Sequence, residues 1–154
     1  MEAFDLYMIF LFSIIVIAYI SHSPLFKLKS SKLEEITQKG LIHYTTKENA
    51  ERIINDGFLK GQKSDLIGPE RFLGNLVWTY QYEDEFSVSE RAEYLSTRNK
   101  AKKNKENFKV CLKLSGFTEN DLKKLRTRKG VIRDNAVVYY GSKLQPQKIE
   151  IINL

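Results

Sequence analysis

The hydrophobic positions follow different patterns along the chain. Residues 4–20, FDLYMIFLFSIIVIAYI, form one almost unbroken apolar run, whereas later apolar positions alternate with polar ones or recur at helical spacing. An unbroken run is typical of a membrane-spanning helix, and at 1.5 Å per residue it would extend about 25 Å, close to the roughly 30 Å of a hydrocarbon core. The pattern predicts a short, uncleaved N-terminal transmembrane helix over 4–20, with a buried core helix as the alternative.

Charged residues beside this run predict its orientation. Acidic residues begin the chain, and Lys27, Lys29 and Lys32 follow the run. Because lysine and arginine favour the cytoplasmic side, we expect a single-pass protein of the cell membrane, with a cytoplasmic C-terminal domain and membrane lipid as a partner. Residues 21–39 would form a juxtamembrane linker, in which a short helix ends at Gly40.

The pattern over residues 40–154 predicts one small domain of the α+β class. Alternating apolar positions predict strands at 41–45, 76–80, 109–114, 136–140 and 148–152, and helical spacing predicts helices after residue 45, over 87–96 and over 118–125. This length suffices for a hydrophobic core without cross-links.

The candidate functional stretch is Leu41 to Leu59, LIHYTTKENAERIINDGFL. Its pattern predicts a strand with His43 and Tyr44 on opposite faces, because side chains alternate along a strand. Thr45 and Glu48 have the spacing of a capping box, so a helix should follow at once. Backbone N–H groups and the positive end of the helix dipole would then lie beside the histidine, where they suit a phosphate or pyrophosphate.

These residues resemble the start of the ADP-ribosyltransferase fold, especially the small bacterial toxin-type members, whose His-Tyr-Thr motif precedes a helix ending in "I…G.L". The resemblance implies that NAD is bound as a substrate. It implies that His43 contacts the adenosine ribose and the nicotinamide end, and that Tyr44 and Thr45 shape the strand. The alternative is a strand histidine that is packed and hydrogen-bonded without a ligand.

The strand around residues 76–80, LVWTY, is similar to the second motif of the same family. The resemblance implies that Trp78, Thr79 and Tyr80 belong to the NAD site, with Tyr80 stacked on the nicotinamide ring. Core packing of Trp78 and cross-strand packing of Tyr80 are the alternatives that the residues leave open.

The C-terminal residues are similar to the family in layout. In the family, a strand carrying the catalytic glutamate is followed by a turn, a proline and a last strand. Here strand-like residues begin at Ala136, and the upstream carboxylate is that of Asp134. The resemblance thus implies Asp134 as the catalytic residue, in place of the glutamate that stabilises positive charge at the nicotinamide ribose.

The charge of the chain supports a second hypothesis. The formal net charge is +6, and basic tracts lie at 98–105 and 123–129. Such a surface can attract nucleic acid. The alternative to a transferase acting on a protein or nucleic acid acceptor is therefore a non-catalytic, membrane-anchored module that binds nucleic acid or protein. Oligomeric state stays open.

Cysteine and histidine are too scarce for a metal centre. Cys111 is the only cysteine and lies in an alternating apolar run, so we expect a buried, inert thiol. His22 and His43 are far apart in sequence and context, and no set of zinc ligands is evident. We therefore expect no metal cofactor.

Overall fold

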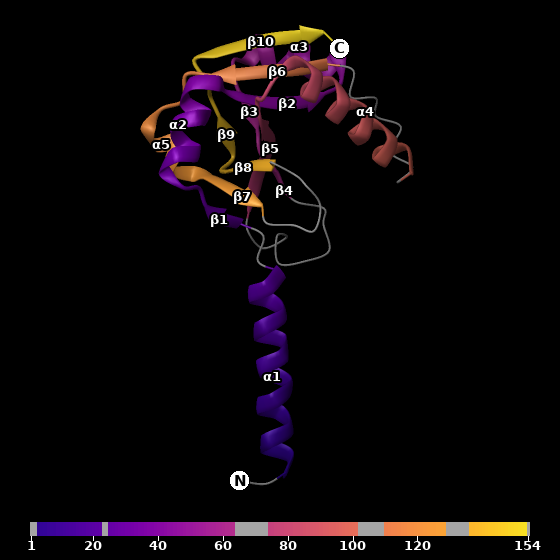
Figure 1. Ribbon diagram of the computed structural model, residues 1–154, viewed down its shortest axis with the longest axis vertical. Coiled ribbons are helices and arrows are strands. Elements are labelled where there is room, and N and C mark those ends of the chain that lie inside the picture. The colour runs from indigo at the N-terminus through magenta and orange to yellow at the C-terminus, as the bar shows by residue number, and fades with distance from the viewer. Residues whose placement is uncertain (1–2, 23–24, 64–73, 102–109, 129–135, 154) are drawn as a thin grey trace.

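The computed structural model describes residues 3–22, 25–63, 74–101, 110–128 and 136–153 (Figure 1). The helices in these ranges are α1 (Ala3–His22), α2 (Ser30–Lys39), α3 (Lys47–Asp56), α4 (Glu85–Ala101) and α5 (Glu119–Lys124). The strands are β1 (Leu25–Lys27), β2 (Leu41–Thr45), β3 (Leu59–Lys60), β4 (Gln62–Lys63), β5 (Asn75–Gln81), β6 (Val110–Ser115), β7 (Leu125–Arg128), β8 (Ala136–Tyr140), β9 (Lys143–Leu144) and β10 (Lys148–Asn153).

The described strands form two antiparallel sheets. The large sheet has eight strands, in the order β1-β7-β8-β5-β2-β6-β10, with β4 paired to β5 beside this path. The small sheet is the pair β3-β9. The strand that carries the histidine motif, β2, therefore lies inside the large sheet, between β5 and β6.

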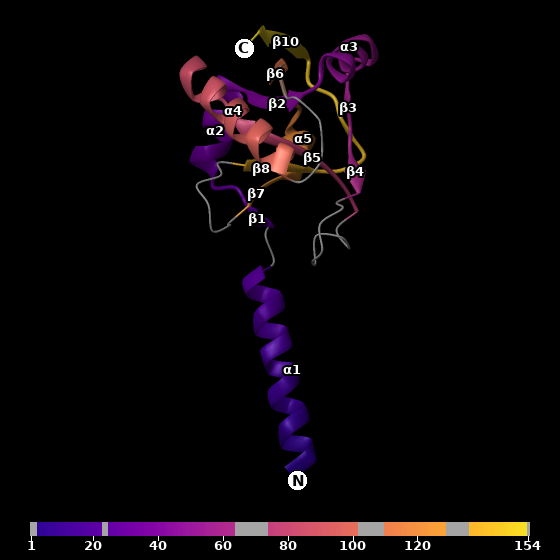
Figure 2. The ribbon, with the colours of Figure 1, turned by 90° about the vertical axis from the view of Figure 1, so that its right-hand side faces the viewer.

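The prediction of a transmembrane helix over 4–20 requires correction. A helix is present there as α1, which projects away from the sheets (Figures 1 and 2). Among the described residues, however, none of the helices combines the length and the apolar character that crossing a membrane requires. The predicted transmembrane element of the fold, and the single-pass location in the cell membrane with a cytoplasmic domain, are overturned by this finding.

The segment predicted as a juxtamembrane linker, 21–39, contains two elements of the domain. Strand β1 pairs with β7, and α2 places Ile36 in the core with none of its surface exposed. Helix α2 ends at Gly40, whose φ of 89° favours glycine and whose N–H donates to the Ile36 carbonyl over 2.8 Å. The chain then enters β2 directly.

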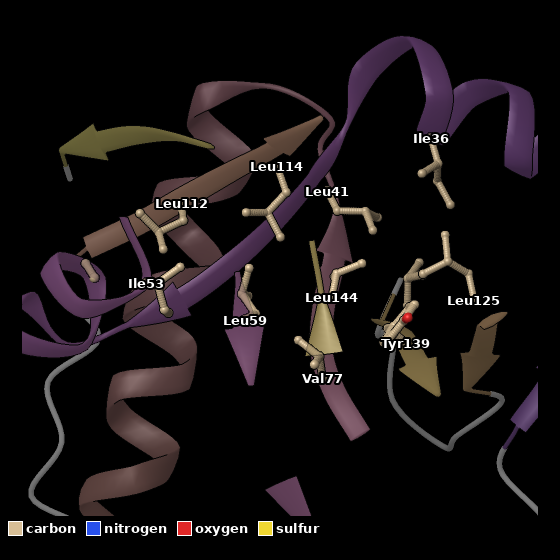
Figure 3. Close-up of a cluster of buried hydrophobic side chains, with 12 residues drawn as sticks. Ile36, Leu41, Ile53, Leu59, Val77, Leu112, Leu114, Leu125, Tyr139 and Leu144 are labelled. Carbon is tan, nitrogen blue, oxygen red and sulfur yellow. The ribbon is translucent and has the colours of Figure 1, made fainter. Parts of the chain in front are cut away.

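The main core lies on one face of the large sheet. Its members come from the large sheet, from α2 and α3, and from the β3-β9 pair. Figure 3 shows Leu59 and Leu144 among the buried side chains of this core, together with Val77 of the large sheet. The remaining fully or nearly buried members are Ile36, Leu41, Ala50, Ile53, Leu112, Leu114, Leu125, Val137 and Tyr139.

Helix α4 covers the opposite face of the sheet and makes a second, smaller core. Val88 and Ala92 of α4 pack against Ile42, Tyr44 and Cys111 of the sheet. The structure thus has helices on both faces of the sheet, and successive residues of β2 enter different cores.

Candidate functional site

His43 is the middle residue of β2, four residues before the first residue of α3. The strand forms because its alternate residues fill the two cores, and the helix follows after one residue. Thr46 caps the helix, since its side chain accepts a hydrogen bond of 3.3 Å from the Asn49 N–H. Thr45, the predicted cap, is instead a buried strand residue. The histidine therefore lies on the strand that leads into a capped helix, and the cap lies one residue later than the sequence pattern indicated.

On the side of β5 that faces β2, only the two ends of the strand pair with other described strands. Strand β2 pairs with Tyr80 and Gln81, and β4 pairs with Asn75 and Leu76. Among the described residues, the three positions between these pairs, 77–79, have a strand partner only on the β8 side. We call this interruption the ladder gap.

The imidazole of His43 spans the ladder gap. Its Nδ1 lies 2.8 Å from the carbonyl oxygen of Trp78. Burial lowers the pKa of His43 below its usual value, and the bond to the Trp78 carbonyl opposes this effect without cancelling it. The ring is therefore neutral at pH 7. A carbonyl accepts only, so Nδ1 carries the proton and Nε2 is left as an acceptor.

Tyr44 lies on the other face of the sheet, under α4. Its hydroxyl donates to the Val88 carbonyl over 3.2 Å, and burial raises its pKa. Its ring meets that of Tyr80 edge to face, with centroids 5.4 Å apart. The guanidinium of Arg91 lies 4.9 Å from the Tyr80 ring centre. Tyr44 and Tyr80 therefore form an aromatic pair that packs α4.

Thr45 and Thr79 are both buried in the sheet. Thr79 has no exposed surface, and its hydroxyl donates to the Val137 carbonyl over 2.6 Å. Thr45 is 4% exposed. The six predicted NAD-site residues are thus divided: His43 contacts Trp78 at the ladder gap, Tyr44 contacts Tyr80 under α4, and the two threonines are structural.

A small polar recess between α4 and the sheet was not predicted. It is lined by Tyr44, Gln81, Glu83, Ser87, Val88 and Arg91. Two of its atoms, Oε1 of Gln81 and Nη1 of Arg91, are buried without a hydrogen-bond partner in the described part of the chain. The recess has no room for a water molecule, so this acceptor and this donor are two unsatisfied polar atoms at the packing surface of α4. The only signal in the sequence was an arginine next to the apolar stripe of α4.

Asp134, the predicted catalytic residue, lies outside the described residues. Cys111 is fully buried, and burial raises its pKa to about 12, so the thiol is protonated and unreactive at neutral pH. Within the described ranges, His, Cys, Asp and Glu side chains do not gather in threes as a metal site would require. The chemistry that these residues offer is therefore that of the His43 imidazole and the adjacent helix N-terminus.

Comparison of the chain with protein-family models, with curated proteins and with solved structures gave no match.

Proposed function

We propose that the ladder gap is the ribose subsite of an NAD-binding site, and that the protein is an ADP-ribosyltransferase-like protein. The observation that carries the proposal is the neutral imidazole of His43, held by its Nδ1–H on the Trp78 carbonyl. In this arrangement Nε2 accepts a hydrogen bond from a ribose hydroxyl. The ring cannot rotate without breaking the bond to the carbonyl, so the acceptor is oriented before the ligand arrives.

The N-terminus of α3 supports the same ligand. The helix begins two residues after β2 ends, and its positive end favours an anionic group. Thr46 satisfies only the Asn49 N–H, so the earlier N–H groups of the first turn are available to a pyrophosphate. A ribose at His43 and a pyrophosphate at α3 match the two polar parts of NAD that are adjacent in the molecule.

The transfer itself would break the bond between the nicotinamide nitrogen and C1 of its ribose. Nicotinamide leaves with the bonding electron pair, and a nucleophile of a protein or nucleic acid acceptor forms the new bond to C1 and loses its proton. The ribose carries positive charge in the transition state, and a carboxylate placed there lowers the barrier. In this proposal Asp134 supplies the carboxylate. Of these two residues, only His43 is needed for NAD binding, whereas transfer needs both.

Calorimetric titration of NAD into the full chain tests the binding step. The His43→Asn variant keeps an amide N–H near the position of Nδ1 but has nothing at the position of Nε2. We expect it to fold normally and to lose NAD binding at least tenfold, equivalent to about 1.4 kcal/mol or one neutral hydrogen bond. His43→Gln, which reaches the position of Nε2, should retain part of the affinity. Equal affinity of the wild-type protein and His43→Asn would refute the site.

Release of nicotinamide tests the transfer step. In the Asp134→Asn variant, which removes a charge without changing the size of the side chain, we expect unchanged NAD affinity and nicotinamide release at least about 100-fold slower, as for loss of one stabilising group. Asn135→Ala, next in the chain, is the control and should release nicotinamide at the wild-type rate. NAD binding without release from the wild-type protein would leave the binding proposal intact and exclude transfer.

A further inference from the structure

Two strands at the edge of the large sheet bring positive charges together from distant parts of the sequence. In the β1-β7 register Lys27 lies directly opposite Arg126. Side chains opposite each other on antiparallel strands are close enough to interact, so like charges there repel. Within the described ranges neither side chain forms an ion pair with an acidic residue. An external anion that binds between Lys27 and Arg126 would therefore relieve this repulsion and stabilise the pair.

Two helices add further positive charge at the same place. Ser30 of α2 and Leu122 of α5 line one shallow hollow, so the first turn of α2 lies against α5. Arg126 Nη1 donates to the Lys123 carbonyl over 2.6 Å, which ties the start of β7 to the end of α5. Lys29 precedes Ser30, and Lys123 follows Leu122.

We call this group the basic corner, and Figure 1 shows its four elements, β1, β7, α2 and α5, at one side of the domain. Its members are Lys27, Lys29, Lys32, Lys123 and Arg126.

The acidic residues near the basic corner neutralise little of its charge. Glu119 contacts Lys123 over 2.7 Å, but both side chains are more than two-thirds exposed, so solvent weakens the pair. Asp121 is buried and accepts hydrogen bonds from Thr118 and from the Tyr139 hydroxyl. Glu34 lies in the hollow between the helices. Glu35 interacts electrostatically with Lys32, so Lys27, Lys29 and Arg126 carry most of the unbalanced positive charge of the corner.

We propose that the basic corner binds the phosphate backbone of a single-stranded nucleic acid. Lysine ammonium groups are point charges that suit phosphates, and the lysines of the corner lie on β1, α2, α5 and the residue before α2, all but Lys32 being exposed. Phe26, between the strand partners of Arg126 and Arg128, is 41% exposed, so an aromatic residue lies among these charges, as in proteins that bind single strands. This surface lies apart from the ladder gap, and the inference does not depend on NAD binding.

Fluorescence anisotropy with a labelled single-stranded oligonucleotide of about 12 nucleotides, within the usual site size of such proteins, tests the inference on the full chain. Each phosphate contact contributes about 0.7 to the slope of the logarithm of the binding constant against the logarithm of the salt concentration. For the double variant Lys27→Gln with Lys29→Gln, we expect the slope to fall by about 1.4 and the affinity at 0.1 M salt to fall about 25-fold.

The matched control is Lys60→Gln with Lys63→Gln. It removes the same charge from two exposed lysines, and Lys60 also lies opposite another lysine, Lys143. In the large sheet β5, β8 and β7 separate β4 from β1, so this control leaves the basic corner intact. Loss of affinity in the first variant alone supports the proposal. Equal losses in both variants, no loss in either, or binding to vesicles of anionic lipid but not to the oligonucleotide would each overturn it.

Discussion

At the scale of single residues, the two nitrogens of His43 have different roles. Nδ1 lies 2.8 Å from the Trp78 carbonyl oxygen, at a position of β5 where β2 no longer pairs with it. A buried carbonyl without a partner is costly, so the imidazole stabilises the fold even without a ligand. Burial keeps the ring neutral, and a neutral ring is also what a ribose hydroxyl needs as an acceptor.

The lowered pKa of His43 makes stability depend on pH. In the unfolded chain the imidazole binds a proton at about pH 6.5, whereas in the folded protein it binds one only at lower pH. The contribution of His43 to stability is therefore fully present above about pH 6.5. It is lost as the pH falls through the folded-state pKa, because the unfolded state binds more protons in this range. We expect a slope of up to about 1.4 kcal/mol per pH unit from this group.

Urea unfolding between about pH 5 and pH 8, on either side of the ordinary histidine pKa, measures this slope. The His43→Asn variant should lose the contribution, while His22→Gln, which leaves His43 in place, should keep it. An unchanged slope in His43→Asn would mean that the imidazole is already solvated in the folded state.

The residue-level features of the site were only partly predictable. Alternation along β2 correctly placed His43 and Tyr44 on opposite faces, because side-chain period follows from strand geometry alone. The sequence could not predict that Thr46 rather than Thr45 caps the helix, because both are threonines. Only the packing of the sheet, which buries Thr45, distinguishes them. The Arg91 recess depends on where α4 docks, which no local pattern specifies.

At the scale of elements, Gly40 joins α2 to β2 where another strand passes very close. A Cβ at Gly40 would lie 2.6 Å from the Leu114 carbonyl oxygen, whereas a Cβ at Gly57 would meet nothing within 4 Å. Both glycines have positive φ. A side chain at Gly57 would therefore cause backbone strain alone, whereas one at Gly40 would cause both backbone strain and a steric clash.

Alanine substitutions at these glycines give a matched pair. We expect Gly57→Ala to lower the free energy of unfolding by about 1–2 kcal/mol, the cost of a left-handed conformation. Gly40→Ala should cost more, because the clash with the Leu114 carbonyl adds to the strain and the sheet must shift. Denaturant unfolding of both variants measures the difference. Equal losses of unfolding free energy would show that the backbone at the β2-β6 contact can shift at little cost.

Elements with strong hydrophobic patterns were predictable, and short ones were not. The strands over 41–45, 76–80 and 136–140 have several apolar residues that fill the cores, so their patterns are clear. By contrast β3, β4 and β9 have two residues each, and β7 reads LRTR. β4 and β7 pair with the longer strands β5 and β8, and β3 and β9 pair with each other, so all four depend on the tertiary arrangement. The basic tract at 123–129 thus contains strand β7, which the sequence pattern did not predict.

At the scale of the whole molecule, the small sheet links the core to the ladder gap. Leu59 pairs with Leu144 across β3-β9, and both side chains are buried in the same core cluster as Val77 (Figure 3). Gly61 then leads from β3 into β4, which pairs with β5 at one end of the gap. Gly61 N–H donates to the Ser142 carbonyl over 2.8 Å, and Gly141 N–H donates to the Asn75 carbonyl over 2.9 Å. The geometry of the gap therefore depends on the packing of the small sheet.

Leu144→Ala tests this dependence. Because Leu144 has no exposed surface, its truncation leaves a cavity and should lower the free energy of unfolding by about 2–5 kcal/mol. Ile151→Ala, at a side chain that is 50% exposed, is the control and should change it by less than about 0.5 kcal/mol. Hydrogen exchange should show faster opening of the β4-β5 amides in Leu144→Ala, since β3 and β4 are joined through Gly61. If those amides keep wild-type protection while global stability falls, the small sheet supports the core without holding the ladder gap, and the orientation of His43 then depends on β2 and β5 alone.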